Sequence, residues 1–116
     1  MNISYEEEFD LLDVIFNEKE HEHANAGYEL RPGLVVFVGK NFSLVQLTAV
    51  CYRRLTEQAA VRFDLLKKQP AKVRDKLLRL IATPPLSSFL RIDAKTFYGR
   101  VMNPTILEAC AKLPLE

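Results

Sequence analysis

Apolar residues near the N-terminus recur at the spacing of one face of an α-helix. Tyr5, Phe9, Leu12 and Phe16 follow one another at intervals of four, three and four residues. The tetrapeptide SYEE begins this stretch, and a serine followed three residues later by a glutamate is the pattern of a capping box. The pattern therefore predicts an amphipathic helix over residues 4–20, with acidic side chains on its polar face.

A run of β-branched and aromatic residues, LVVFV at 34–38, predicts a short strand because it is bounded by glycine and proline. Its expected partner is the stretch around Tyr28–Leu30, joined to it through a turn at residues 31–33. Such a hairpin would cover about residues 28–38 and would have to lie against helices, since an isolated hairpin is barely stable in water. The alternative is an extended apolar segment buried between helices.

The next stretch carries two signals for the start of a helix. Ser43 and Gln46 form a second capping box, and Phe42 and Leu47 occupy the positions of a hydrophobic staple. Apolar residues then continue at steps of three or four, at Leu44, Leu47, Cys51, Leu55, Ala59, Phe63 and Leu66. These signals predict one long helix over residues 43–69, which ends before Pro70.

The remaining third of the chain predicts shorter helices. Pro70 suits the first turn of a helix over residues 70–82, and the sequence TPP closes it. The stretch LSSFLRI at 86–92 fits a short helix or an extended segment equally well. Asp93 and the pair Asn103-Pro104 are helix-start signals, so we expect short helices within residues 94–113.

These elements fit one compact domain, because 116 residues are enough for a single hydrophobic core and too few for two independent ones. The expected fold class is mainly α. We expect residues 1–116 to form a single small helical domain of four to five helices, with at most a short two-stranded β element at about residues 28–38.

The net charge of +1 conceals an uneven distribution of charge along the chain. Residues 1–30 hold nine acidic residues and one basic residue, a net charge of −8. Residues 31–116 hold fifteen basic residues and six acidic residues, a net charge of +9. Such asymmetry indicates binding to a polyanion or a charged interaction arm. The alternative is that the two parts neutralise each other within one fold.

The sequence offers no convincing catalytic site. The stretch PGLVVFVGKN resembles a phosphate-binding loop, but five residues instead of four precede its Gly-Lys pair, and Asn41 replaces the hydroxyl residue that binds magnesium. His21 and His23 lie in an acidic tract without the frame that a metal site needs. Cys51 and Cys110 are expected on apolar helix faces, where a thiol is inert. We therefore expect no enzyme activity, no metal and no small-molecule cofactor.

The apolar segments, the N-terminal residues and the cysteines also indicate the cellular compartment of the protein. No apolar stretch approaches the roughly 20 residues that span a bilayer, and the chain opens with acidic residues, so we expect neither a membrane segment nor a secretory signal. Two cysteines among apolar residues favour a reducing, cytoplasmic compartment. A Cys51–Cys110 disulfide is the alternative.

A concentration of basic residues gives the leading functional hypothesis. Residues 53–79 hold nine basic against three acidic residues, and such clusters bind phosphate backbones. The nucleic-acid contacts predicted from this stretch are Arg53, Arg54, Lys67, Lys68, Lys72 and Lys76. The hypothesis is a small regulatory protein that binds nucleic acid through a basic helical face.

A protein-protein adaptor, assembly factor or inhibitor is the alternative. It would act through the acidic N-terminal helix and through spare apolar residues on the long helix, which include Val45, Val50, Tyr52 and Val61. The same surface could join two copies of the chain. The size and the lack of a catalytic constellation suit a bacterial or phage accessory protein.

Overall fold

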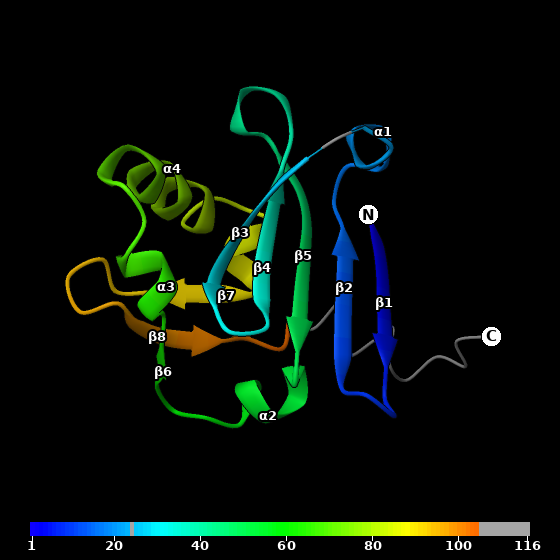
Figure 1. The fold of residues 1–116 in the computed structure, drawn as a ribbon. Helices are drawn as coiled ribbons and strands as arrows, with labels where there is room; N and C mark the ends of the chain where they lie inside the picture. Colours follow the sequence, from blue (N-terminus) through cyan, green and yellow to red (C-terminus); the bar gives the residue numbers. More distant parts are fainter. Residues whose placement is uncertain (24, 105–116) are drawn as a thin grey trace.

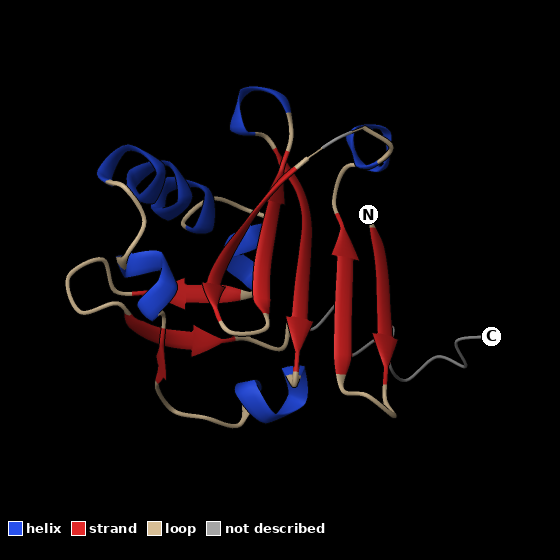
Figure 2. Cartoon of the chain, viewed as in Figure 1, coloured by secondary structure: helices blue, strands red, loops and turns tan. Residues whose placement is uncertain are grey.

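The computed structural model describes residues 1–23 and 25–104. Within these residues the protein is mainly β. It forms eight strands in two antiparallel sheets, and its short helices lie at the periphery (Figure 2). The expectation of a mainly α, helical domain with at most a two-stranded β element is therefore wrong.

The larger sheet contains five strands in the order β1-β2-β5-β4-β3 (Figure 1). In chain order these strands are β1 (Asn2–Glu6), β2 (Leu11–Ile15), β3 (Ala26–Arg31), β4 (Leu34–Val38) and β5 (Leu44–Val50). Two hairpins, β1–β2 and β3–β4, thus flank the central strand β5, and every neighbouring pair is antiparallel.

The helix expected over residues 4–20 is replaced by the β1–β2 hairpin and by α1 (Glu18–His21). Leu12 and Val14 are both fully buried, so β2 places every second residue in the core as a strand does. Phe9, expected on the apolar face of the helix, instead lies in the hairpin turn and is 64% exposed. Pairing of β2 with β1 and β5 outweighs the local helical spacing, because it satisfies the backbone on both sides.

The strand expected at residues 34–38 has the same bounds as β4. Its hairpin partner β3 is reached through a turn in which Gly33 has a φ of 83°, a conformation that favours glycine. The carboxylate of Glu29 accepts a hydrogen bond from the Gly33 amide at 3.0 Å. The other side of β4 pairs with β5, so this hairpin belongs to the five-stranded sheet.

The long helix expected over residues 43–69 does not form. Its residues are divided among β5, α2 (Tyr52–Thr56), β6 (Val61–Arg62) and α3 (Asp64–Lys67). In β5, Leu47 and Ala49 are buried while Gln46 and Thr48 lie on the opposite face. This alternation of every second residue is typical of a strand. Cys51, with a φ of 57°, turns the chain at the end of β5.

The helix α4 (Ala71–Ile81) lies within the range 70–82 and buries Leu77 and Ile81. It is followed by the 3-10 turn η2 (Leu86–Ser88) and by two strands, β7 (Leu90–Ile92) and β8 (Tyr98–Val101). Residues 98–101 were expected to be helical, and that expectation is wrong. The helices expected beyond residue 104 lie outside the described residues.

The three later strands form a second sheet in the order β6-β8-β7. Figure 1 shows β7 and β8 running across the direction of β4 and β5. One core connects the two sheets and α4, and it includes the fully buried side chains of Val36, Phe63 and Leu77. This arrangement leaves α3, α4 and the second sheet together on the side away from the β1–β2 hairpin (Figure 1).

Candidate nucleic-acid interface

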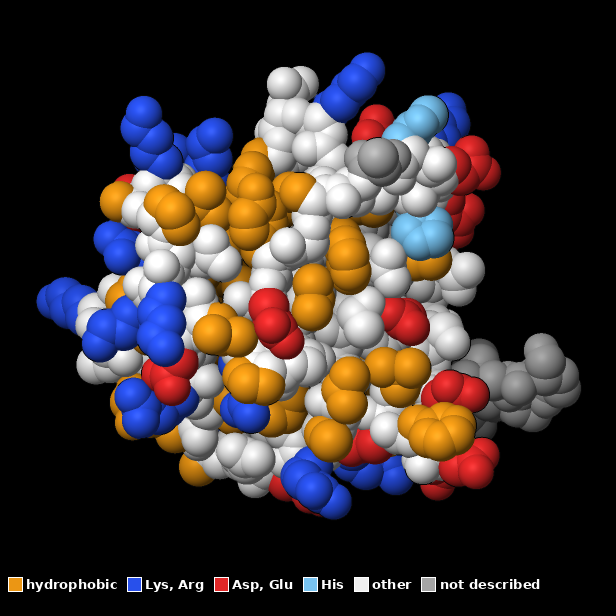
Figure 3. All heavy atoms as spheres, viewed as in Figure 1, with side chains coloured by type: hydrophobic (Ala, Val, Ile, Leu, Met, Phe, Trp, Pro, Cys, Tyr) orange, Lys and Arg blue, Asp and Glu red, His pale blue; other side chains and the backbone are white. Residues whose placement is uncertain are grey.

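The two charge classes of the sequence are distributed unevenly over the face of the molecule shown in Figure 3, although each also occurs elsewhere on that face. In Figure 3, Lys and Arg side chains gather on the left, over α3 and α4, whereas Asp and Glu side chains gather on the right, over α1 and the β1–β2 hairpin. The acidic N-terminal part therefore does not cover the basic elements.

The six predicted contact residues are all exposed, but the structure divides them into two groups. Arg53 and Arg54 lie on α2, at the lower end of β5 in Figure 1, whereas α4 lies at the upper left. The four lysines, Lys67, Lys68, Lys72 and Lys76, follow the end of α3 and the length of α4. The single basic helical face expected over residues 53–79 therefore does not exist.

Helix α2 contacts acidic residues of the β1–β2 hairpin through the Arg53 side chain and through the backbone amides of Arg53 and Arg54. The Arg53 guanidinium lies 4.0 Å from the Glu7 carboxylate and 5.3 Å from the centre of the Tyr5 ring. The backbone amides of Arg53 and Arg54 donate to the Asp10 carboxylate at 2.7 and 3.3 Å. These contacts join α2 to the β1–β2 hairpin.

Asp10 is the centre of this junction. Its desolvation raises the pKa of the carboxyl, but hydrogen bonds from the Tyr5 hydroxyl and from the amides of Arg53 and Arg54 outweigh that effect and hold the pKa below its ordinary value. Burial, followed by the bond to Asp10, raises the pKa of the Tyr5 hydroxyl to about 12. Arg53 thus has a structural role through its side chain, whereas Arg54 contributes to the junction through its backbone amide only. Both lie on α2, away from the lysines of α3 and α4 (Figure 1).

The lysines of α3 and α4 lack such partners. Among residues 1–23 and 25–104, the ion pairs are Arg53 with Glu7 and Arg62 with Asp64, so no carboxylate oxygen lies within 4.0 Å of these lysines. An exposed cation without a partner keeps its full attraction for a phosphate. The α3–α4 lysines are therefore the part of the predicted set that is best placed to bind nucleic acid.

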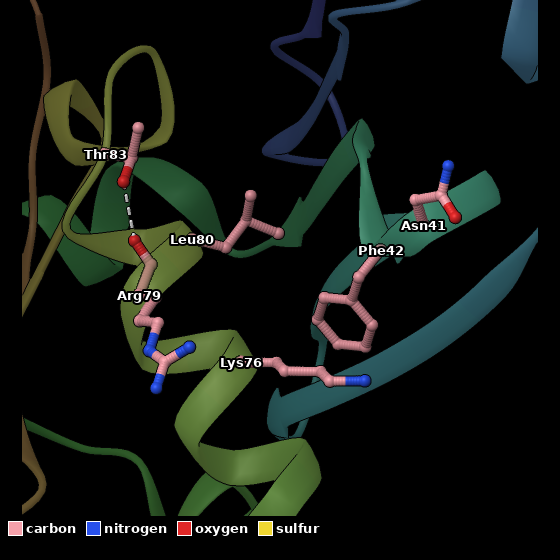
Figure 4. A pocket seen from close by; sticks show the side chains of 6 residues that line it. All are labelled: Asn41, Phe42, Lys76, Arg79, Leu80 and Thr83. Carbon is pink, nitrogen blue, oxygen red and sulfur yellow. Dashed lines mark hydrogen bonds between the residues drawn. The ribbon is translucent and has the colours of Figure 1, made fainter.

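A groove lies between α4 and the 3-10 turn η1 (Lys40–Phe42), with a volume of about 530 Å³ (Figure 4). Six residues line it, namely Asn41, Phe42, Lys76, Arg79, Leu80 and Thr83. The Phe42 ring packs on Tyr28, with ring centres 5.5 Å apart. The Lys76 ammonium extends from α4 toward the other edge of the groove and lies 5.5 Å from the Phe42 ring centre (Figure 4).

Of the six residues that line this groove, only Lys76 is among the contacts predicted from the sequence. Phe42 was interpreted as part of a hydrophobic staple for a helix that does not form, and Arg79 was counted with the basic residues but not chosen as a contact. Basic, amide and aromatic side chains follow each other in the stretch KNF at 40–42, but only the positive φ values of the η1 turn place the Phe42 ring in the groove.

The outer face of the second sheet carries a further basic cluster. Arg91 on β7 is the direct cross-strand partner of Arg100 on β8, and both side chains are exposed. On the same face, Tyr98 is 45% exposed and the Arg62 guanidinium lies 5.7 Å from its ring centre. Arg91, Tyr98 and Arg100 also line a second groove of about 610 Å³ between this sheet and α4.

The spare apolar residues that suggested an adaptor are mostly used inside the fold. Val45, Tyr52 and Val61 are buried, and Val50 is 45% exposed. The long apolar helix on which the adaptor hypothesis depended is absent, because its residues form two strands and two short helices within the described part of the chain.

The remaining candidates for chemistry lie apart from each other. Cys51 has a free thiol but is exposed, which contradicts its expected place on an apolar helix face, and Cys110 lies outside the described residues. His21 and His23 are exposed near α1. Over residues 1–23 and 25–104, no three His, Cys, Asp or Glu side chains come together in a group that could hold a metal ion. In the same residues, no helix has the length and apolar character needed to cross a bilayer.

Comparison with known proteins finds no matching family model, no matching curated protein and no matching solved structure. The binding properties of this chain are therefore inferred from its own residues.

Proposed function

We propose that this protein is a non-catalytic, cytoplasmic nucleic-acid-binding protein that contacts the phosphate backbone through α3 and α4. The observation that carries this proposal is the row of exposed lysines, Lys67, Lys68, Lys72 and Lys76, without a carboxylate partner in the described residues. Basic side chains of this kind bind phosphates by releasing counterions, without a specialised motif.

The arginine pair of the second sheet also supports the proposal. Like charges directly opposite each other in a sheet are destabilising, and a bound phosphate would remove the repulsion between Arg91 and Arg100. The pair lies against the flank of α4 that carries Leu78, Ile81 and Ala82, whereas Lys76 lies on the flank that faces η1, so a polyanion that contacts both would have to pass around α4.

The proposal is tested by measuring the affinity for short DNA and RNA oligonucleotides by fluorescence anisotropy across a range of salt concentrations. The double variant Lys72→Gln/Lys76→Gln should bind more weakly, and the slope of log affinity against log salt should fall by about 2, roughly one for each lost phosphate contact.

The matched control is Arg53→Gln/Arg54→Gln, which removes the same charge from α2 and should change the slope little. Absence of binding at low salt would overturn the proposal and favour a protein-protein adaptor. An equal loss in the two double variants would show that net charge alone, and not the α4 surface, drives binding.

A further inference from the structure

We propose that the groove between η1 and α4 binds an unpaired base, so that the ligand is single-stranded nucleic acid. This inference rests on the proposed function and specifies its substrate class. Its basis is that one groove combines an aromatic ring, Phe42, with two cations, Lys76 and Arg79.

The aromatic ring is held in place from two directions. Phe42 is half-buried and packs on Tyr28 at 5.5 Å, with an angle of 36° between the rings. Asn41 and Phe42 have φ values of 56° and 59°, left-handed conformations that persist only where the surrounding structure enforces them. The η1 turn thus fixes a ring at the groove surface, and a base can stack on a ring in this position.

The two cations are positioned to bind the phosphates beside that base. Lys76 and Arg79 are three residues apart on α4, so their side chains project from the same side of the helix. No carboxylate is among the six residues that line the groove. A phosphate on either side of a stacked base would therefore meet a cation and no opposing acid.

Polar groups near the ring suit the edge of a base. The Asn41 amide offers both donor and acceptor groups, which can pair with a base edge. The Thr83 hydroxyl donates to the Arg79 carbonyl at 2.7 Å, which ties the end of α4 beside the groove. The groove volume of about 530 Å³ lies in the usual range for a small-ligand site.

A double helix does not fit this arrangement as well, because its bases are paired and stacked inside and only its phosphates could approach. A free mononucleotide has the same base and phosphate chemistry. It would leave Lys67, Lys68 and Lys72 unused, whereas the next phosphates of a strand could reach them. A single strand therefore uses both the groove and the lysines.

The test compares a single-stranded oligonucleotide, the duplex of the same sequence, and a mononucleotide under one salt condition. We expect the native protein to bind the single strand at least about tenfold more tightly than either other ligand, since the duplex offers no unpaired base to stack and the mononucleotide offers no further phosphates to Lys67, Lys68 and Lys72.

Phe42→Leu keeps an apolar side chain against Tyr28 but removes the stacking surface. It should weaken single-strand binding about tenfold while leaving the salt slope unchanged. Phe42→Tyr should retain binding. The matched control is Phe9→Leu, which removes an aromatic ring that is 64% exposed on the acidic hairpin and should have no effect.

A second measurement uses the native protein, so that it does not depend on the folding of a variant. A strand carrying 5-iodouridine should crosslink under light to the peptide that contains Phe42. Duplex binding as tight as single-strand binding, unchanged affinity of Phe42→Leu, mononucleotide binding as tight as strand binding, or crosslinks that avoid this peptide would each overturn the inference. Salt-dependent binding that persists in those cases would leave the proposed function intact, whereas no binding to any ligand would overturn both.

Discussion

Arg91 on β7 and Arg100 on β8 lie directly opposite each other in the second sheet, and both are exposed. Within the described residues neither has a carboxylate oxygen within 4.0 Å. The nearby Asp93 carboxylate instead accepts from the amides of Lys95 and Thr96. The fold therefore tolerates a repulsive pair at a surface position where a neutral residue would serve stability better.

The first prediction concerns this pair. Arg100→Thr should raise the free energy of unfolding by about 0.2–1 kcal/mol, because it removes the repulsion and places a β-branched residue in a strand. The same variant should weaken nucleic-acid binding and lower the salt slope by about 1. Urea unfolding measures the change in stability, and anisotropy titrations measure the change in binding.

Arg62→Thr is the control, because it removes an ion pair with Asp64 and should not stabilise the protein. A destabilised Arg100→Thr variant would contradict the prediction.

The second prediction concerns Gly99, in the middle of β8. A Cβ atom at this position would lie 1.9 Å from the carbonyl oxygen of Arg91, which belongs to the paired strand and cannot move independently. Gly99→Ala should therefore destabilise the protein by about 1–3 kcal/mol or more. At Gly27 an added Cβ would meet the movable ring of Phe37, so Gly27→Ala should cost less. Equal urea midpoints for the two variants would refute this difference.

The third prediction concerns stability in acid. The pKa of Asp10 is lowered in the folded protein, so its contribution to stability is present above the unfolded value of 3.8 and is lost as the pH falls through the lower folded value. Asp10→Asn should reduce stability at neutral pH and flatten the dependence of stability on pH below about 4. Asp75→Asn, an exposed position on α4, serves as the control. If Asp10→Asn and Asp75→Asn both lose stability with falling pH as steeply as the native protein does, titration of Asp10 does not cause the loss of stability in acid.

The fourth prediction concerns alkaline conditions. The pKa of Tyr5 is raised from 10.0 to about 12, so its contribution to stability is complete below pH 10 and is lost as the pH rises through about 12. Burial also raises the pKa of Tyr52, so ultraviolet titration of tyrosinate should show two late-titrating groups, of which Tyr5→Phe removes one. The variant should also lack the part of the stability loss that the native protein shows in this range. A titration of Tyr5→Phe with as many late-titrating tyrosines as the native protein would show that Tyr5 is not one of them.

The sequence predicted which apolar residues are buried more reliably than it predicted the secondary structure that they adopt. Leu47, Leu55 and Phe63, placed on one stripe of a long helix, are all buried. They reach the core from β5, α2 and the start of α3, because pairing between distant strands is not visible in a local window. In β5 the spacing of apolar residues fits both the helical period of about 3.6 residues and the strand period of two. Pairing with β2 and β4 selects the strand.

The candidate interface could be predicted only in part, because some of its residues also depend on contacts between distant parts of the chain. Lys72 and Lys76 lie on a helix that local signals describe well, and both are exposed as expected. Phe42 and the pair of Arg91 with Arg100 depend on strand register and on a turn with positive φ, which the sequence does not reveal. Arg53 was selected for its charge alone, and its partner Glu7 comes from a different part of the chain.

On the face shown in Figure 3, Lys and Arg side chains are concentrated over α3 and α4, whereas Asp and Glu side chains are concentrated near α1 and the β1–β2 hairpin, so the electrostatic field around the molecule is uneven. Such a field acts over a distance of about 10 Å at 0.1 M salt and turns the molecule before any contact is made. A polyanion would therefore meet the α3–α4 side first and be repelled by the hairpin side. Salt should slow the association rate as well as weaken the final complex, and the molecule should arrive in one preferred orientation.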